Sequence, residues 1–347
     1  MDVDSKVELA TRNALEVVTE DELKTLFETK QTPTAYIGYE PSGFVHVGQV
    51  ITATKIAELQ KAGVDVTMFL ADWHAMINDK LGADIGNIRI CGEYMRESFI
   101  ALGIREDTKF VWANDLVNRA EYWEKFIRVC KASSLMRIKR AMTIMGRTED
   151  EAEIDASKVM YPPMQVADIF ELDVDIALAG MDQRRAHMLA RDVAEKLGWR
   201  KPVALHTPLL MSLVGAGRMD PVEAKMSKSD PNSAIFLHDT PEDIHRKMKN
   251  AFCPPEAENN PVLEVMRLIV FPKLGGVTIE RPAKFGGPVT FDSYQEIHST
   301  YESKSLHPMD LKKGAADSLA TVLAPVREYF SKNPKNLDRL KNISITR

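Results

Sequence analysis

The sequence predicts an α/β protein in which a doubly wound parallel sheet precedes a mostly helical second domain. Two observations carry this prediction. Nearly continuous apolar runs of strand length alternate with helical patterns up to about residue 210, and the strand signal fades beyond about residue 233. Apolar strands alternating with helices are typical of a parallel sheet covered on both faces. The chain of 347 residues is long enough for two domains, which we place at 1–232 and 233–347.

The first domain is expected to contain five strands, at 35–39, 64–72, 109–115, 174–180 and 202–210. Helices are expected between them, at 50–63, 84–103, 119–147 and 184–198. Residues 1–30 should form short helices, because Thr19-Glu20-Asp21-Glu22 has the spacing of a capping box. Ligands of such sheets bind at the carboxyl ends of the strands, so the turns after the strands are the places to look for a site.

The second domain is expected to be built from helical patterns separated by Pro and Gly, at 241–252, 261–271, 294–303 and 307–330. Phe285-Gly286-Gly287-Pro288 is such a punctuation.

Composition narrows the class of protein. The formal charge of −5 excludes a protein that is basic all over, but a local basic surface can still bind nucleic acid. Cys91, Cys130 and Cys253 are scattered, which argues against a disulfide framework and a structural zinc site. No apolar run approaches the ~20 residues of a membrane span, and the acidic N-terminus lacks a signal-peptide pattern. We expect a soluble cytoplasmic protein without a membrane partner.

Two stretches far apart in the chain suggest a phosphate site. His46 stands in Pro41-Ser42-Gly43-Phe44-Val45-His46-Val47-Gly48-Gln49-Val50, where the first of these strands turns into a helix whose N-terminus favours anions. Ala224-Lys225-Met226-Ser227-Lys228-Ser229-Asp230 offers cations and hydroxyls after the last strand. Taken singly, His46 could be a packed histidine and the lysine pair a solvated loop.

Together, the two stretches resemble the signature motifs of the class I aminoacyl-tRNA synthetases, with a Rossmann-like catalytic domain. The resemblance implies that His46, Gln49, Lys225 and Lys228 act in catalysis. It implies that ATP, with Mg²⁺, is bound by Gly38, His46, Gly48, Lys225, Ser227, Lys228 and Ser229, without a protein metal site. The sequence departs from the family at Gln49, where a histidine is usual; a glutamine amide still donates a hydrogen bond but cannot titrate.

A third stretch indicates the amino acid. Tyr161, Gln165 and Asp168 share one face if 164–171 is helical, although Asp168 could instead cap or pair on the surface and Tyr161 could simply pack. In context the stretch resembles the tyrosine pocket of the archaeal/eukaryotic branch of the tyrosyl-tRNA synthetases. The resemblance implies that Tyr161, Gln165 and Gln183 hold the ammonium group of tyrosine. It implies that Tyr36 and Asp168 hold the phenol hydroxyl.

The same resemblance implies where tRNA(Tyr) binds. The segment 128–147 carries six basic residues and no acidic one, which elsewhere would be read as a solvated helix face. Within this family, Arg140, Arg184 and Arg185 match the readers of the first acceptor-stem base pair. The reader of the first anticodon base matches Phe285, His307, Pro308, Met309 and Asp310. Alternatively, Phe285 belongs to the core and Asp310 caps the following helix.

The reaction expected from the resemblance is ligation of tyrosine to tRNA(Tyr) through tyrosyl-adenylate, by a homodimer. Two alternatives remain. A tryptophanyl-tRNA synthetase would share the fold and both phosphate motifs, but an indole offers one N–H donor and no acceptor, and a Tyr36/Asp168 pair suits a hydroxyl better. A non-catalytic RNA-binding paralogue is suggested only by Gln49, and the intact Lys225-Met226-Ser227-Lys228-Ser229 run speaks against it.

Overall fold

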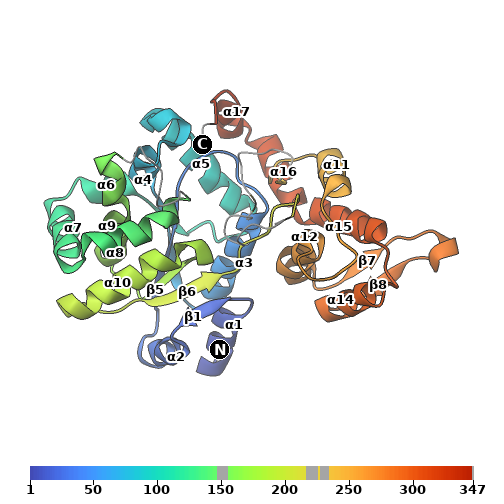
Figure 1. Ribbon diagram of the computed structural model, residues 1–347, viewed down its shortest axis with the longest axis horizontal. Coiled ribbons are helices and arrows are strands. Elements are labelled where there is room, and N and C mark those ends of the chain that lie inside the picture. Colours follow the sequence, from blue (N-terminus) through green and yellow to red (C-terminus); the bar gives the residue numbers. More distant parts are fainter. Residues whose placement is uncertain (147–154, 216–225, 227–233, 346–347) are drawn as a thin grey trace.

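The computed structural model describes residues 1–146, 155–215, 226 and 234–345. Its main sheet has six strands in the order β1-β6-β5-β2-β3-β4 (Figure 1). These are β1 (Glu16–Val18), β2 (Thr34–Tyr39), β3 (Asp65–Leu70), β4 (Lys109–Trp112), β5 (Ile176–Gly180) and β6 (Val203–Thr207). Strands β2 to β6 run parallel, and β1 pairs antiparallel with β6. The five predicted strands and the doubly wound α/β fold are confirmed.

The strand order reverses between β2 and β5. From β2 the chain proceeds through β3 to the edge at β4, then returns to β5 on the other side of β2 and continues to β6. Adjacent loops therefore part in opposite directions beyond the carboxyl ends of β2 and β5, which is where doubly wound sheets bind ligands. The segments that follow these two strands contain His46 and Gln183.

Helices surround this sheet (Figure 1). They are α1 (Val3–Thr11), α2 (Glu20–Thr29), α3 (Gly48–Lys61), α4 (Asp72–Ile77), η1 (Lys80–Ala83), α5 (Ile85–Ala101), α6 (Ala113–Val117), α7 (Ala120–Ala132), α8 (Leu135–Ala141), η2 (Met142–Met145), α9 (Ala156–Glu171), η3 (Met181–Gln183) and α10 (Arg184–Leu197). The predicted capping box is present, since the Glu22 amide donates to Thr19 Oγ1 and the Thr19 amide to Glu22 Oε2, both at 3.2 Å.

Three local predictions were wrong. Residues 16–18 form β1 instead of helix, because they pair with the edge of β6. Three residues are too few to show the alternating pattern of a strand. Residues 113–115 begin α6 instead of extending β4. The helix expected at 119–147 is broken at Ser134, whose side chain accepts from the Arg137 amide and so starts α8.

The C-terminal segment adds a second group of helices: α11 (Pro241–Asn250), α12 (Pro261–Val265), the π-helix η4 (Met266–Val270), α13 (Phe271–Leu274), α14 (Tyr294–Glu302), α15 (Pro308–Val322), α16 (Ala324–Lys332) and α17 (Lys335–Lys341). It also contains an unpredicted hairpin of β7 (Val277–Ile279) and β8 (Val289–Phe291), with η5 (Ala283–Phe285) near its tip. The domain boundary expected at 232/233 lies outside the described residues.

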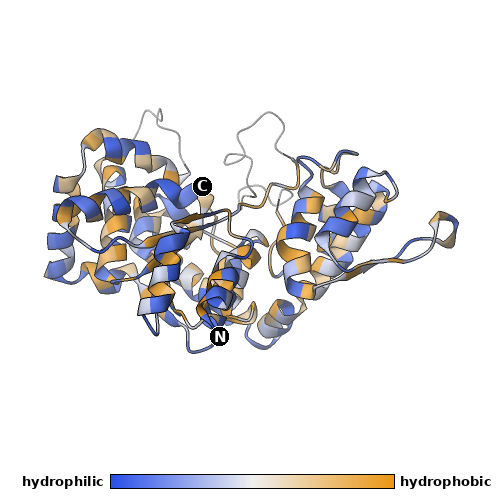
Figure 2. Cartoon of the chain, turned by 90° about the horizontal axis from the view of Figure 1, so that it is seen from below, coloured by the Kyte–Doolittle hydropathy of each residue, from blue (hydrophilic) through white to orange (hydrophobic). Residues whose placement is uncertain are grey.

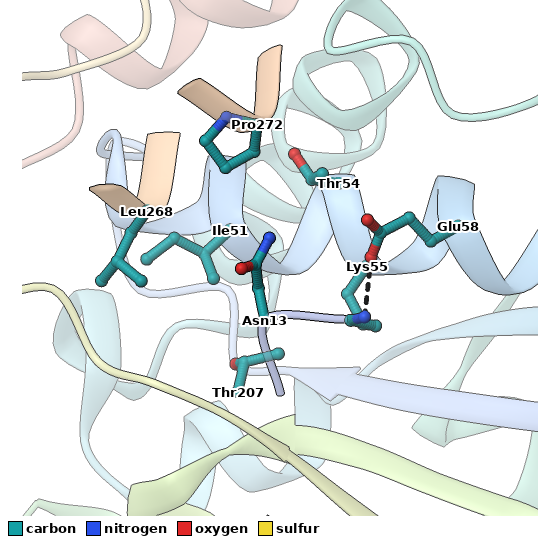
Figure 3. Close-up of a pocket in the computed structure, with 8 residues that line it drawn as sticks. All are labelled: Asn13, Ile51, Thr54, Lys55, Glu58, Thr207, Leu268 and Pro272. Atoms are coloured by element: carbon teal, nitrogen blue, oxygen red, sulfur yellow. Dashed lines mark ion pairs between the residues drawn. The ribbon is translucent and has the colours of Figure 1, made fainter. Parts of the chain in front are cut away.

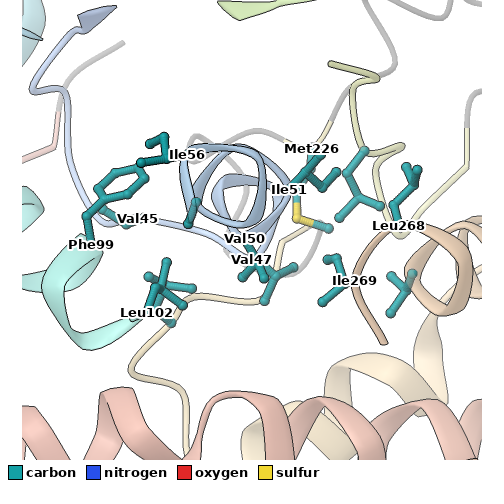
Figure 4. Packing of buried hydrophobic residues seen from close by; sticks show 14 of the residues in the cluster. Val45, Val47, Val50, Ile51, Ile56, Phe99, Leu102, Met226, Leu268 and Ile269 are labelled. Carbon is teal, nitrogen blue, oxygen red and sulfur yellow. The ribbon is translucent and has the colours of Figure 1, made fainter. Parts of the chain in front are cut away.

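The two groups of elements share one hydrophobic cluster. Val47 and Ile51 pack with Met226 and with Leu268 and Ile269 of η4 (Figure 4). The helices of both groups are striped with hydrophobic and hydrophilic residues, as amphipathic helices are when one side is buried (Figure 2). The C-terminal helices are thereby fixed against α3, whose first turn carries the predicted phosphate motif.

A small pocket beside α3 is part of this packing and not a substrate site. It holds about 10 Å³, and its lining includes Asn13, Lys55, Glu58 and Leu268 (Figure 3). This is room for roughly one water molecule.

None of the described helices has the length and apolar character needed to cross a bilayer.

Candidate active site

The segment after β2 places His46 at the reversal of the sheet. The Val47 amide donates to Ile235 O at 2.9 Å, and the Leu237 amide donates to Val45 O at 3.0 Å, so His46 forms an antiparallel bridge with Phe236. This short pairing joins the first predicted motif to the chain that follows the second one. Residues distant in sequence are therefore adjacent here.

Gly48 is required by the imidazole of His46. The Gly48 amide donates to His46 Nδ1 at 3.2 Å, which orients the ring against the first turn of α3. A Cβ on Gly48 would lie 2.8 Å from His46 Cε1 and 2.9 Å from Nδ1. Any other residue at position 48 would have to displace the imidazole.

Gln49 is anchored at one end of its side chain. The Thr52 hydroxyl shares its proton between Gln49 O at 3.0 Å and Gln49 Oε1 at 3.3 Å, and it accepts from the Tyr39 hydroxyl at 2.6 Å. With its oxygen turned to Thr52, the amide nitrogen of Gln49 is the end that can donate to a ligand. This arrangement is consistent with the donor role expected at this position.

Helix α5 and the C-terminal segment hold the loop that carries His46. The Gly43 amide donates to Cys91 Sγ at 3.2 Å, and the Val45 amide donates to the Tyr94 hydroxyl at 3.4 Å. Gly43 has a φ of +130°, and a Cβ there would lie 3.1 Å from Ile345 Cγ2. Glycine is thus needed for the backbone conformation and for the close approach of Ile345.

Of the second motif, Lys225, Ser227, Lys228 and Ser229 lie outside the described residues. Met226 is described. It is buried, and its amide donates to Leu210 O at 2.8 Å. Leu210 Cβ would be 3.7 Å from a Cβ on Gly48. The middle of the second motif is therefore anchored beside the first.

The five residues predicted to bind tyrosine are brought together. We call Tyr36, Tyr161, Gln165, Asp168 and Gln183 the polar cluster. Gln165 Nε2 donates to Gln183 Oε1 at 3.4 Å, and the Gln165 side chain hydrogen-bonds with Tyr36. Charge on Asp168 acts on both tyrosines, raising their pKa further above the value that burial already imposes. Helix α9 supplies three members from one face, as predicted, while β2 and η3 supply Tyr36 and Gln183.

Asp168 is the buried end of the polar cluster and not a surface residue. The Tyr122 hydroxyl donates to Asp168 Oδ1 at 2.9 Å. His74 Nε2 lies 3.2 Å from Asp168 Oδ2, though not at hydrogen-bonding angles. Burial raises the pKa of Asp168 well above its usual range and lowers the pKa of His74 to about 3. The alternative that Asp168 caps a helix or pairs on the surface is therefore wrong.

Tyr161 is also fixed by a polar partner. Its hydroxyl donates to Glu40 Oε1 at 3.0 Å, and Asn78 Nδ2 donates to the same oxygen at 2.9 Å. The Tyr161 ring stands edge-on to His74, with centroids 4.8 Å apart. Tyr161 therefore packs and also presents a hydroxyl held in place.

Gly38 marks where a ligand can reach the sheet. It is exposed although its neighbours Ile37 and Tyr39 in the central strand are buried. A Cβ there would lie 3.5 Å from the Tyr36 ring. Because a side chain would fill this opening, glycine lets a ligand approach the strand closely.

Sequence reasoning missed the residues that hold the polar cluster in place, namely His74, Tyr122 and Glu40. Two of them had a usable signal, since Glu40 directly follows β2 and His74 lies in the first turn of α4, just beyond the carboxyl end of β3. Tyr122 had no such signal, because the sequence of an amphipathic helix does not distinguish a tyrosine that binds a carboxylate from one that only packs in the core.

The three arginines predicted to contact tRNA are also neighbours. Arg185 Nη1 donates to Arg140 O at 2.8 Å and to Thr143 Oγ1 at 2.9 Å. Arg184 forms a bidentate ion pair with Glu16, at 2.8 to 3.0 Å. All three arginines are exposed. They surround the N-terminal turn of α10, next to Gln183 of the polar cluster.

The residues predicted to read the anticodon lie at the far end of the molecule. Phe285 is 59% exposed in η5, under the ammonium group of Lys284 at 4.8 Å from the ring centroid. His307 caps α15 by accepting from the Met309 amide at 3.1 Å, with Pro308 as the first helical residue. Asp310 lies in the first turn. The alternatives that Phe285 is core and that Asp310 is the cap are both wrong.

The second pocket lies elsewhere and is open to solvent. It is a groove of about 450 Å³ between α8 and α10, whose lining includes Arg137, Arg140, Asp192 and Lys196. Arg140 lines the groove, whereas no residue of the polar cluster does, so the groove is not the site of the buried carboxylate. Within the described ranges, no group of three or more His, Cys, Asp or Glu side chains is close enough to hold a metal ion.

Comparisons agree with this geometry. The family model for tRNA synthetases class I (W and Y) matches residues 28–324. A tyrosine–tRNA ligase of Saccharolobus islandicus is 48% identical over 357 residues, covering 99% of each chain. The crystal structure of tyrosyl-tRNA synthetase from Aeropyrum pernix is similar with a TM-score of 0.89 and 45% identity, covering 99% of each chain. That of tyrosyl-tRNA synthetase complexed with L-tyrosine from Pyrococcus horikoshii is similar with a TM-score of 0.93 and 40% identity, covering 99% of this chain and 100% of the other.

Proposed function

The chain belongs to the class I tRNA synthetases (W and Y), and we infer that it is a tyrosine–tRNA ligase of the archaeal type. The enzyme joins tyrosine and ATP to give tyrosyl-adenylate and pyrophosphate. It then transfers the tyrosyl group to the 3′-terminal ribose of tRNA(Tyr), releasing AMP.

One observation carries the choice of tyrosine, namely the buried carboxylate of Asp168 beside Tyr36. Together they offer a hydroxyl both an acceptor and a donor. An indole N–H can use the acceptor but leaves the donor unpaired, and a phenyl ring leaves both unpaired. Unpaired buried polar groups cost about 1–3 kcal/mol each, so this end of the site disfavours tryptophan and phenylalanine. Tyr161, Gln165 and Gln183 would hold the ammonium group.

The chemical step is attack of the tyrosine carboxylate oxygen on the α-phosphorus of ATP. A new O–P bond forms while the bond to the pyrophosphate oxygen breaks, so the leaving group carries the electron pair away. His46 and the amide nitrogen of Gln49 would donate to the phosphate oxygens from the first turn of α3. Lys225 and Lys228 would compensate the charge that develops during the step. The bridge between His46 and Phe236 supports convergence of these groups, because it fixes the chain after the lysines beside the imidazole.

ATP itself would lie over Gly38 and Gly48, where the absence of side chains lets a nucleotide approach the backbone. Ser227 and Ser229 would add hydroxyl donors to the phosphates. Magnesium would enter with ATP, held mainly by phosphate and water oxygens, and would neutralise part of the charge on the pyrophosphate.

Binding of tRNA would use both halves of the molecule. Arg140, Arg184 and Arg185 would contact the acceptor stem beside the polar cluster. At the other end, the exposed ring of Phe285 would stack on an anticodon base, and the carboxylate of Asp310 would accept from guanine. We accordingly assign 1–232 to the catalytic domain and 233–347, including His307, Pro308 and Met309, to the anticodon-binding domain.

A homodimer is supported by apolar side chains on the surface of α7 and α8. Ile127, Leu135 and Met136 are 53%, 58% and 70% exposed. Large exposed apolar side chains are typical of an interface. Changing Met136 to glutamate should shift the mass measured by light scattering towards the monomer, and an unchanged dimer mass would exclude this surface.

A cytoplasmic location follows from the function, because the reaction needs ATP and uncharged tRNA. The three free cysteines, Cys91, Cys130 and Cys253, fit a reducing compartment.

Exchange of labelled pyrophosphate into ATP tests the assignment, measured separately with tyrosine, tryptophan and phenylalanine. Only tyrosine should support fast exchange. Exchange that depends on tryptophan would identify a tryptophanyl-tRNA synthetase, and absence of exchange with all three would identify a non-catalytic paralogue.

A further inference from the structure

A chain of hydrogen bonds runs from Arg184 through Glu16 and His206 to His187, whose ring faces Tyr36 of the polar cluster. Arg184 holds the carboxylate of Glu16 in a bidentate pair. Glu16 Oε2 lies 2.9 Å from His206 Nδ1, and His206 Nε2 lies 3.0 Å from His187 Nδ1. Both imidazoles are fully buried and stack with centroids 5.0 Å apart. The His187 ring then faces Tyr36 of the polar cluster, with centroids 6.5 Å apart.

The carboxylate fixes the tautomer of both rings. The hydrogen bond from Arg184 lowers the pKa of Glu16, so Glu16 is an anion that can only accept. His206 must therefore carry its proton on Nδ1. Burial lowers the pKa of His206 and lowers that of His187 to about 3, so both rings are neutral. His206 Nε2 is then a lone pair, and His187 must donate to it from Nδ1.

With a proton on Nδ1 of each ring, Nε2 of His187 carries a lone pair. In the described part of the chain, this atom is buried and has no hydrogen-bond partner. A buried acceptor without a donor costs about 1–3 kcal/mol, so its retention next to Tyr36 needs a reason. The surroundings of the pair offer few charges that could interfere: Glu16, Arg184 and Asp182 act on His206, and His187 feels only His206.

We propose that Glu16, His206 and His187 form a relay through which the binding of tRNA at Arg184 is transmitted to the tyrosine site. This inference rests on the proposed function, because it takes Arg184 as an acceptor-stem contact and the polar cluster as the tyrosine site. Glu16 and the two histidines are positioning residues and touch no substrate.

The physical basis is competition for one guanidinium group. Nε and Nη2 of Arg184 are bound to Glu16, so a phosphate that takes this edge of the guanidinium draws it away from Glu16. Glu16 then loses its cation, and its negative charge favours a proton on the imidazole pair. A proton taken up from solvent puts an N–H on Nε2 of His187 in place of the lone pair. The His187 ring faces Tyr36, so its Nε2 then meets the polar cluster as a donor instead of an unpaired acceptor, which favours a bound hydroxyl that can accept from it. Binding of tRNA should therefore tighten binding of tyrosine, and by linkage tyrosine should tighten binding of tRNA equally.

The decisive variant is Glu16→Gln, compared with Glu22→Gln as a matched control. Glu22 also forms a bidentate pair with an arginine of α10, Arg191, at 2.8 and 2.9 Å, but contacts no histidine. The dissociation constant of tyrosine is measured by calorimetry with and without a tRNA(Tyr) transcript. The wild type and Glu22→Gln should bind tyrosine about fivefold tighter or more when tRNA is bound. In Glu16→Gln this factor should fall below about twofold while tRNA still binds.

The relay would be overturned if tRNA tightened tyrosine binding equally in all three proteins. It would also be overturned if tRNA did not change tyrosine binding in the wild type. Loss of tRNA binding in Glu16→Gln would also count against it, because the relay makes Glu16 a competitor of tRNA. If the wild type does not bind tyrosine at all, the proposed function fails and not only the relay.

A spectroscopic measurement tests the tautomers without tRNA. In protein labelled with ¹⁵N-histidine, the signals of His187 and His206, assigned with His187→Asn and His206→Asn, should show a protonated Nδ1 and a bare Nε2. This arrangement of protonated Nδ1 and bare Nε2 atoms should be lost in Glu16→Gln and retained in Glu22→Gln. Bare Nδ1 atoms in the wild type would contradict the relay.

Discussion

At the residue scale, the proposed recognition of tyrosine rests on a carboxylate that the fold keeps buried. Asp168 accepts from Tyr122 with one oxygen, which leaves the other oxygen, beside His74, for a ligand. Ligand binding to a polar group that is already held in position costs little free energy, because the group need not rearrange. In this proposal the selectivity of the site also depends on Tyr122 and His74, which contact Asp168.

Replacing Asp168 by asparagine should reduce discrimination between tyrosine and phenylalanine. Enzymes of this class reject phenylalanine by about 10⁵-fold. An amide carries no charge and would turn a donor or a weaker acceptor to the hydroxyl, so the ratio of the two kcat/KM values should fall by about tenfold or more. Pyrophosphate exchange with each amino acid measures this ratio. Asp173→Asn, which changes an exposed carboxylate, is the control. An unchanged ratio in Asp168→Asn would remove this residue from hydroxyl recognition.

Buried histidines should make stability fall in mild acid. Burial lowers the pKa of His187 to about 3 in the folded state, below the usual value of 6.5 that the unfolded chain retains. The unfolded state therefore binds more protons between these values, so the stabilisation is complete above pH 6.5 and is lost as the pH falls towards 3. The free energy of unfolding should drop by about 2 kcal/mol between pH 7 and 5 for such a group.

Urea unfolding of the wild type and His187→Asn at both pH values measures this contribution. The variant should lose less stability on acidification than the wild type by about that amount. His74 follows the same direction, whereas Asp168, with a raised pKa, opposes it. For this reason the comparison uses His187. Equal losses in the two proteins would show that His187 is not held neutral.

At the scale of elements, helices α1 and α3 are joined by one buried lysine. Lys55 Nζ donates to Leu9 O at 3.3 Å, to Ala10 O at 3.0 Å and to Arg12 O, which satisfies the carbonyls at the end of α1. It also pairs with Glu58 at 2.7 Å (Figure 3). A cation at a helix C-terminus complements both the unpaired carbonyls and the helix dipole.

Changing Lys55 to methionine should destabilise the protein by about 2–4 kcal/mol, because the partly buried Glu58 and several carbonyls lose their partner. Chemical denaturation gives the free energy of unfolding. Lys61→Met, at an exposed position of the same helix, should change it by less than about 0.5 kcal/mol. If both variants lose the same amount, Lys55 is not the link between α1 and α3.

The hairpin of β7 and β8 presents the proposed anticodon contact. Replacing Phe285 by alanine should lower kcat/KM for tRNA in aminoacylation by roughly 5- to 100-fold, since stacking of one base contributes about 1–3 kcal/mol. Pyrophosphate exchange should not change, because the hairpin lies at the other end of the molecule (Figure 1). Leu274→Ala, at another exposed apolar position, is the control. Equal losses in exchange and aminoacylation would contradict an anticodon role.

The elements that sequence patterns predicted are those whose signal is local. Strands β2, β3 and β5 are continuous apolar runs, and α10 shows a clear helical period that ends at Gly198, with a φ of +66°. The missed strands β1, β7 and β8 have three residues each, too few for any period. Their existence depends on a partner strand elsewhere in the chain, which local pattern cannot reveal.

At the scale of the whole molecule, the site is assembled by topology. The reversal of the sheet between β2 and β5 brings Tyr36 and the His46 loop next to Gln183, and α9 closes the polar cluster with Asp168. The motifs predicted that these side chains lie together, and the structure brings them together; their contact with tyrosine is part of the proposed function. The partners Tyr122 and Glu16 could not be predicted, because their roles arise from contacts across 46 and 190 residues of chain. Long-range contacts of this kind carry no signature in one sequence.

Placement of a bound reaction intermediate tests the central claim most directly. In a crystal structure with a non-hydrolysable tyrosyl-adenylate analogue, the phenol oxygen should lie within hydrogen-bond distance of Tyr36 and Asp168. The group that replaces the phosphate should lie beside His46 at the first turn of α3, with Lys225 or Lys228 within reach. A ligand whose ring does not enter the polar cluster, or whose phosphate position is remote from His46, would contradict the account.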